Sequence, residues 1–214
     1  MMNVATEEID ILGEKLVLTN QRVIFWESES ALILSDLHVG KTAHFRKNGI
    51  AIPKDILEKD LARLEFLING FPAKKVIVNG DLLHAGDNSD VDDFCEWKNS
   101  VNAEFHLVQG NHDRISKKLS EKLCLNSVVE NVETEIFCFV HQFDESIEKF
   151  QITGHIHPGI MLRTPIQNIK LPCFAVSERQ LLMPAFSEFT GLDTKNLPKN
   201  ARYYAFTEKE IHSL

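Results

Sequence analysis

Residue types that bind metal ions occur where apolar runs of the sequence end. Three such groups lie in the first half of the chain: Asp36 and His38 after ALILS, Asp81 after KVIVNG, and Asn111, His112 and Asp113 after FHLVQG. Continuous apolar runs of this length are typical of strands that are buried on both faces. Because the carboxyl ends of neighbouring strands meet at one edge of a sheet, we expect these side chains to lie close together.

Two more groups follow in the second half of the chain. They are His141 after IFCFV, and the pair His155 and His157, which belong to GHIH after QIT. Carboxylate, imidazole and amide ligands together suit manganese, iron, zinc or magnesium better than copper(I) or an iron–sulfur cluster. One such group alone would carry little information. Five groups in this order, each at the end of an apolar run, indicate a metal site.

The elements that must position these groups alternate between strand and helix at first and are mostly strands later. We expect a hairpin over Lys15–Trp26, helices over 53–69, 91–101 and 116–123, and strands over 31–35, 75–79, 105–109, 128–132, 135–140, 151–153 and 203–206, with short strands through Phe174 and Leu182. Three motifs adjoin a glycine, Gly80, Gly110 or Gly154, where a tight turn needs permissive backbone. The pattern favours a layered α/β sandwich.

The composition is that of an ordinary soluble globular protein. The chain has 214 residues and 43% hydrophobic residues, which predicts a single domain over residues 1–214. We expect a cytoplasmic protein, because the sequence shows no secretory signal pattern and no segment able to span a membrane. The four cysteines are widely spaced, which favours free thiols over a disulfide framework. The net charge of −8 does not point to nucleic acid, but two divalent ions would offset it locally.

The ordered set DLH, GD, GNHD, a single His and GHxH resembles the calcineurin-like metallophosphoesterases. This resemblance implies a four-layer α/β/β/α sandwich with two mixed sheets and a two-metal site between them. It also implies the ligands: Asp36, His38 and His157 for one ion, Asn111, His141 and His155 for the other, and Asp81 bridging both. The cofactors expected are two divalent ions, with manganese favoured over iron, zinc or magnesium.

Three longer segments, GKTAHFRKNGIAIP, GDLLHA and LPCFAVSERQLLMPAFSEFTGLD, are similar to one bacterial subgroup of that family. These are the ligase-associated DNA damage response endonucleases, or PdeM-type phosphoesterases. The resemblance implies a phosphodiesterase or nuclease acting on DNA, with a DNA ligase and a helicase as partners. VHQFDES and SEF depart from the subgroup's pattern, which leaves the substrate open. The alternatives are a small-molecule (nucleotide) phosphodiesterase or phosphomonoesterase, and a non-catalytic scaffold on the same fold.

The remaining polar residues receive roles from the expected chemistry. A pair of metal ions would activate a water for in-line attack at phosphorus. We expect His112 to protonate the leaving group, oriented by Asp113. Arg114, Arg46 and Lys41 are candidates to bind substrate phosphate, with solvated surface charge as an equal alternative. A basic path for DNA would add Lys47 and Arg163, whereas His44 and His84 stay unassigned.

Overall fold

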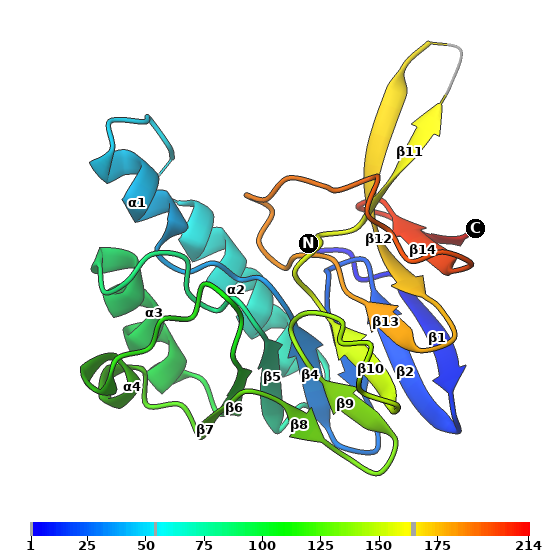
Figure 1. Ribbon diagram of the computed structural model, residues 1–214. Helices are drawn as coiled ribbons and strands as arrows, with labels where there is room; N and C mark the ends of the chain where they lie inside the picture. The colour runs from blue at the N-terminus through cyan, green and yellow to red at the C-terminus, as the bar shows by residue number, and fades with distance from the viewer. Residues whose placement is uncertain (1, 54, 164–165) are drawn as a thin grey trace.

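Two mixed β-sheets lie face to face, and helices cover one of them (Figure 1). The structure, a computed structural model, describes residues 2–53, 55–163 and 166–214. The first sheet has the order β1-β2-β3-β4-β5-β6-β7. Its strands are β1 (Thr6–Ile11), β2 (Glu14–Thr19), β3 (Ile24–Trp26), β4 (Ala31–Leu34), β5 (Lys75–Asn79), β6 (Glu104–Val108) and β7 (Ser127–Val129). Strands β1 to β4 pair antiparallel and β4 to β7 pair parallel, so β4, β5 and β6 end at one edge.

The second sheet has the order β15-β14-β12-β13-β10-β9-β8, and β11 pairs with β12 beside this path. Its strands are β8 (Val132–Glu133), β9 (Phe137–Phe139), β10 (Phe150–Thr153), β11 (Gly159–Arg163), β12 (Asn168–Val176), β13 (Gln180–Leu182), β14 (Arg202–Phe206) and β15 (Ile211–Ser213). Strand β10 is parallel to both β9 and β13, and the other pairs are antiparallel. The expected hairpin over Lys15–Trp26 is confirmed as β2 and β3.

The alternation of side chains along the central strands builds two cores. In β4, Leu32 and Leu34 pack toward the helices, whereas Ala31 and Ile33 pack toward the second sheet. Successive side chains of a strand point to opposite faces, so a run that is apolar at every position must be covered on both sides. This is why ALILS and KVIVN read as continuous apolar runs.

The described helices all come from the first 123 residues: α1 (Lys41–Lys47), α2 (Ile56–Gly70), α3 (Ser89–Ser100) and α4 (Lys117–Leu123). The Asn88 side chain accepts a hydrogen bond from the Asp90 N–H at the start of α3, and Ser116 caps α4 in the same way. The helix expected over 53–69 begins later, at Ile56, and Lys54 lies outside the described residues. Helix α1 was not expected, because KTAHFRK is short and lacks apolar periodicity. None of the described helices has the length and apolar character needed to cross a membrane.

The outer face of the second sheet carries small and polar side chains that are nonetheless buried, among them Cys138, Gln151, Cys173 and Ala175. Two loops lie against it. Gln151 donates hydrogen bonds from Nε2 to the carbonyl oxygens of Asp144 and Ile147, and the Tyr203 hydroxyl donates to the Pro198 carbonyl. The α/β class and the two mixed sheets are confirmed. Within the described residues, however, these loops take the place of the second helical layer that the family resemblance implies.

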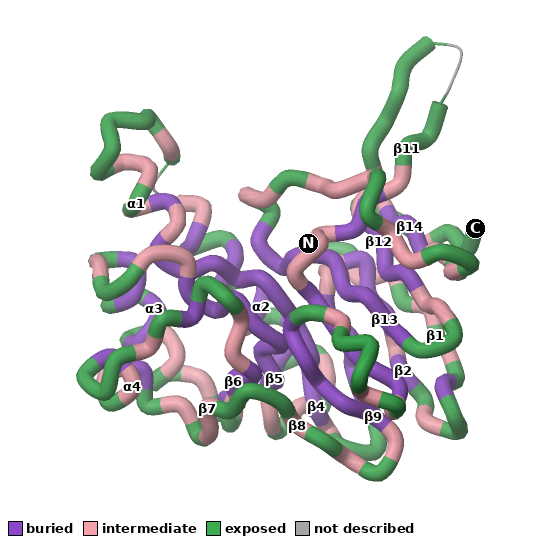
Figure 2. Tube along the Cα trace, viewed as in Figure 1, coloured by how far each residue is buried: buried purple, intermediate pink, exposed green. Residues whose placement is uncertain are grey.

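A two-stranded arm, formed by β11 and the first half of β12, projects from the body of the molecule (Figure 1). Its outer part is exposed (Figure 2). The arm begins at Gly159, two residues after the GHIH motif, so its base lies next to the residues that the sequence singled out.

Candidate metal centre

The structure brings six of the seven predicted metal ligands into two compact groups. One consists of Asp36, His38 and His157, and the other of Asp81, His141 and His155. Within each group the potential ligand atoms lie within 4.8 Å of one another. The first group matches the set expected for one ion, and the second contains both histidines expected for the other. The seventh predicted ligand, Asn111, is exposed in the turn after β6, and its metal role stays a prediction.

Several buried ligand atoms in the two groups lie close together without forming a hydrogen bond. The Nε2 atom of His157 lies 3.0 Å from Oδ1 of Asp36, and Nε2 of His141 lies 3.3 Å from Oδ2 of Asp81. Yet Asp36 Oδ1 and both Nε2 atoms lack a hydrogen-bond partner among the described residues. Burying such lone pairs without a partner is costly, and a divalent cation would satisfy them. The donors present therefore fit a metal centre.

Neighbouring polar groups hold these ligands in place. Nδ1 of His141 lies 2.9 Å from the Asn79 carbonyl oxygen, so the ring proton on Nδ1 leaves the Nε2 lone pair free for a metal. Oδ2 of Asp36 accepts hydrogen bonds from the Ser35 hydroxyl and from the His155 N–H. The Asn79 amide donates to carbonyl oxygens of β10 and of the residue after β9, which ties the two sheets together. The sequence did not reveal Ser35 or Asn79, because polar residues at the ends of apolar runs look like ordinary strand ends.

The backbone of the ligands is strained. A positive φ, which non-glycine residues rarely adopt, occurs at five of them: Asp36 (57°), His38 (54°), Asp81 (51°), His155 (72°) and His157 (55°). Each such residue costs on the order of 1 kcal/mol or more, and persists only where the surroundings impose it. Strain concentrated on the candidate ligands is therefore independent support for a functional site.

The three motif glycines make room for these ligands. At Gly80, with φ of 92°, a Cβ atom would lie 2.0 Å from Nδ1 of His141. At Gly110 it would lie 2.2 Å from Oδ1 of Asp81, and at Gly154 it would lie 1.8 Å from the Ser35 hydroxyl oxygen. The expected reason, a turn that needs permissive backbone, holds only for Gly80. The other two have ordinary φ values and are required by close packing.

Burial and opposite charge compete in setting the protonation of the centre. Burial alone would raise the pKa of Asp81, but the His141 imidazole beside it outweighs burial and lowers this pKa to about 2. Burial would likewise lower the pKa of His141, but the carboxylates of Asp81 and Asp36 raise it to about 9. Burial prevails at His38, where the pKa falls to about 3. A cation that binds here at neutral pH would displace the proton from His141.

His112 lies at the mouth of the centre and is exposed. Its ring stacks on His84 with 5.1 Å between centroids and lies 6.0 Å from the ring of His38. Its backbone N–H donates a hydrogen bond to Asp81, which links the turn to a candidate ligand. Asp113 is buried, and its two carboxylate oxygens accept hydrogen bonds from the N–H groups of Leu83 and Gly110. Asp113 therefore fixes the backbone of two loops. Through these bonds its carboxylate holds main-chain N–H groups and not the imidazole ring of His112.

A match to a protein-family model over more than half of the chain decides the family. Residues 30–157 match the family model described as calcineurin-like phosphoesterase, a segment that contains every predicted metal ligand. The chain belongs to this family. Calcineurin-like phosphoesterases use a pair of divalent metal ions, and this chain is a metal-dependent hydrolase of phosphate esters.

Solved structures add a second comparison. The nuclease MPE of Pseudomonas putida superimposes with a TM-score of 0.82 and 29% sequence identity, covering 98% of this phosphoesterase and 100% of that chain. A protein of unknown function from Aquifex aeolicus, AQ665, reaches a TM-score of 0.43 at 18% identity, covering 59% of this chain and 78% of its own. No curated protein matches the chain.

The three basic residues predicted to bind phosphate occupy different surroundings in this phosphoesterase. Lys41 is half-buried, lies with His38 along one cavity and has its ammonium group 5.7 Å from the centroid of the Phe189 ring. Burial lowers the pKa of its ammonium group. Arg114 is exposed, next to His112 in the chain. Of the three basic residues, Lys41 is thus the one that shares a cavity with a candidate metal ligand, His38.

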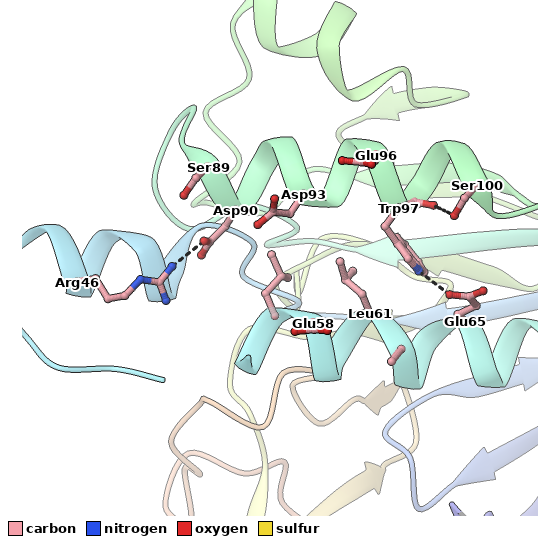
Figure 3. A pocket seen from close by; sticks show the side chains of 12 residues that line it. Arg46, Glu58, Leu61, Glu65, Ser89, Asp90, Asp93, Glu96, Trp97 and Ser100 are labelled. Carbon is pink, nitrogen blue, oxygen red and sulfur yellow. Dashed lines mark hydrogen bonds and ion pairs between the residues drawn. The ribbon is translucent and has the colours of Figure 1, made fainter. Parts of the chain in front are cut away.

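Arg46 has a structural partner. Its guanidinium lies 2.9 Å from the buried carboxylate of Asp90, at one end of a groove between α2 and α3 (Figure 3). The same carboxylate accepts hydrogen bonds from the Thr42 hydroxyl and the Ala43 N–H, so Asp90 ties α1 to α3. Arg46 reaches a substrate only if it leaves this ion pair, and its substrate role stays a prediction.

Proposed function

We propose that this phosphoesterase is a manganese-dependent nuclease that cleaves phosphodiester bonds of DNA. The observation that carries the proposal is the similarity to the Pseudomonas putida nuclease, which extends over nearly the whole of both chains at 29% identity. The set of candidate ligands supports catalysis rather than a scaffold role. The sequence has a suitable residue at each of the seven ligand positions of the family's motif set, and six of these residues form the two groups.

The chain's own residues divide the work at the phosphate. Bound divalent ions would supply Lewis-acid activation of water and neutralise charge that develops on the phosphoryl oxygens. His112 is exposed at the mouth of the centre and donates a proton to the leaving oxygen. Asp113 positions His112 by fixing the backbone of the GNHD turn through Gly110. Lys41, half-buried beside His38, attracts the anionic substrate.

The finer parts of the proposal rest on the sequence resemblance. Manganese is favoured because the subgroup that the GKTAHFRKNGIAIP and GDLLHA segments resemble suggests it, and because oxygen and imidazole ligands accept it. A role in DNA repair, together with a DNA ligase and a helicase, follows from the same resemblance. The proposed location is the cytoplasm. Binding of this chain to a ligase and to a helicase, each tested by co-purification, checks that part separately.

The test compares three substrates in the presence of manganese: an oligodeoxynucleotide, bis-p-nitrophenyl phosphate and p-nitrophenyl phosphate. We expect cleavage of the oligodeoxynucleotide and preference for the aryl diester over the monoester. Asp81→Asn should abolish both, because it removes a carboxylate of the second ligand group. A preference for the monoester would instead indicate a phosphatase. Diester cleavage without DNA cleavage would indicate a small-molecule phosphodiesterase, and inactivity with every divalent metal would indicate a scaffold.

A further inference from the structure

A cleft on the arm side of the metal centre contains two lysines that the proposed function does not yet use. It has a volume of about 390 Å³ and is lined by His157, Lys170, Asp193, Thr194 and Lys195, among others. His157 is also a candidate metal ligand, so the cleft lies next to the centre. Lys170 lies in the arm on β12, and Lys195 lies in the loop that follows the SEF segment.

Backbone hydrogen bonds hold the Lys195 loop against the metal centre. The Asp193 N–H donates to the His157 carbonyl over 3.0 Å, and the Gly159 N–H donates to the Asp193 carbonyl over 2.9 Å. The Asp193 carboxylate accepts hydrogen bonds from the N–H groups of Lys195 and Asn196 and from the Asn196 side chain. These bonds lower the pKa of Asp193 to about 2. The position of Lys195 beside His157 is therefore built by the fold.

The charges of this region favour an anionic ligand. No acidic residue occurs in the sequence between Glu148 and Glu178, although the chain contains 31 acidic residues and has a net charge of −8. Lys170 and Lys195 are both exposed. Neither ammonium group has a hydrogen bond or an ion pair within the described ranges 2–53, 55–163 and 166–214. Asp193 is the one carboxylate among the described residues that line the cleft. Its oxygens accept hydrogen bonds from the turn, and the Lys195 ammonium group also attracts it electrostatically.

We infer that Lys170 and Lys195 bind a backbone phosphate of the nucleic-acid substrate, next to the phosphate that is cleaved at the metal centre. The inference rests on the proposed nuclease function and assigns it a second phosphate-binding subsite. A strand that passes the metal centre must carry further phosphates, and a basic groove that follows the backbone is how proteins bind single strands without reading their sequence. A small aryl diester has no second phosphate and does not use the cleft.

The test compares the double variant Lys170→Gln/Lys195→Gln with a control that loses one charge elsewhere, Lys15→Gln. Lys15 is exposed at the start of β2, which runs in the same direction as β4, so it lies at the opposite edge of the first sheet from the metal centre. Binding of a fluorescent oligodeoxynucleotide is measured by anisotropy in the non-cleaving Asp81→Asn background at several salt concentrations. Hydrolysis of bis-p-nitrophenyl phosphate is measured in variants that retain Asp81.

We expect the double variant to bind the oligodeoxynucleotide roughly 10-fold more weakly and to lower the salt slope by about 0.7, the contribution of one phosphate contact on a single strand. Turnover of the aryl diester should stay within about twofold of the wild type, and Lys170→Arg/Lys195→Arg should bind normally. A single uncharged methylphosphonate linkage, moved along the strand, should weaken binding by the wild type at one position near the cleavage site. It should have no effect there on the double variant.

Equal binding by the double variant and Lys15→Gln would overturn the subsite while leaving the nuclease proposal intact. A parallel loss of aryl diester turnover would also overturn it, because that result would place the lysines in the folding of the metal centre. If the wild type neither binds nor cleaves the oligodeoxynucleotide, both the subsite and the nuclease proposal fail.

Discussion

The metal centre and the surfaces beside it are built in different ways. At the centre, each carboxylate is buried, receives hydrogen bonds from neighbouring loops and sits on backbone with positive φ. Beside it, the basic residues Lys170, Lys195 and Arg114 are exposed, and no hydrogen bond or ion pair of their charged groups to another described residue restrains them. The difference teaches that the fold fixes the candidate metal ligands in place, whereas the exposed basic side chains beside them are not held by contacts of this kind.

The largest effect should come from filling the space at Gly80. Its Cβ in Gly80→Ala would overlap the His141 ring and meet a φ of 92°. A displacement of about 1 Å can cost about 100-fold in rate, so we expect turnover of an aryl diester to fall by at least this factor. Gly70→Ala is the matched control, since it makes the same change in open space at the end of α2. Equal activity of the two variants would show that the metal centre tolerates a shift of the His141 ring.

His112→Ala should have the next largest effect, and the effect should depend on the leaving group. With a poor leaving group, such as a nucleoside hydroxyl, loss of the proton donor should slow cleavage by roughly 100-fold. With p-nitrophenolate, which leaves without a proton, the loss should be much smaller. Uniform loss with both substrates would point to a structural role, in keeping with the stacking of His112 on His84.

How far the sequence predicts this site depends on where a residue's partners lie. His141 and His155 could be predicted because each follows an apolar run. Such a run is a buried strand, and its last apolar residue marks the strand end beside which the histidine lies. The contact of Asp113 with the Leu83 N–H joins two loops through the tertiary fold, and no local pattern indicates it. The cleft lysines, Lys170 and Lys195, also could not be found from a local pattern. Lys195 reaches the centre through the tertiary pairing of Asp193 with Pro158.

The layers of the fold show the same limit. The central strands are predictable because burial on both faces leaves an unbroken apolar run. The outer face of the second sheet is covered by loops, and its small side chains, such as Cys173 and Ala175, do not indicate what covers them. Helix α1 depends on the Asp90 carboxylate, which lies far along the chain from Thr42.

Removal of the metal should lower stability more than it changes the fold. Asp36 and Asp81 are buried and both have lowered pKa values, so without a cation their charges rely on the neighbouring imidazoles and on a few hydrogen bonds from Ser35 and backbone N–H groups. One ion at about 100 times its Kd stabilises the native state by ~2.7 kcal/mol, which corresponds to a Tm shift of roughly 5–10 °C for a chain of this size. Calorimetry with manganese and with a chelator checks this. Asp81→Asn should show a smaller shift, and an equal shift would place the ion elsewhere.

The smallest effects should distinguish Lys41 from Arg46. Lys41→Gln should raise KM for an oligodeoxynucleotide a fewfold, because it removes a charge beside His38. Arg46→Gln should leave KM nearly unchanged and lower the stability by up to about 1 kcal/mol, since it breaks a partly exposed ion pair with Asp90. Steady-state kinetics and thermal unfolding of both variants make the comparison. A higher KM for Arg46→Gln alone would reverse the assignment.

The most direct test of the dinuclear centre is the metal content of the purified protein. The chain is loaded with manganese, freed of excess metal by gel filtration and measured by elemental analysis. The two ligand groups predict two ions per chain in the wild type, and one ion in His157→Ala, which loses a ligand of the first group only. A wild type that retains no ion or a single ion under these conditions would contradict the account.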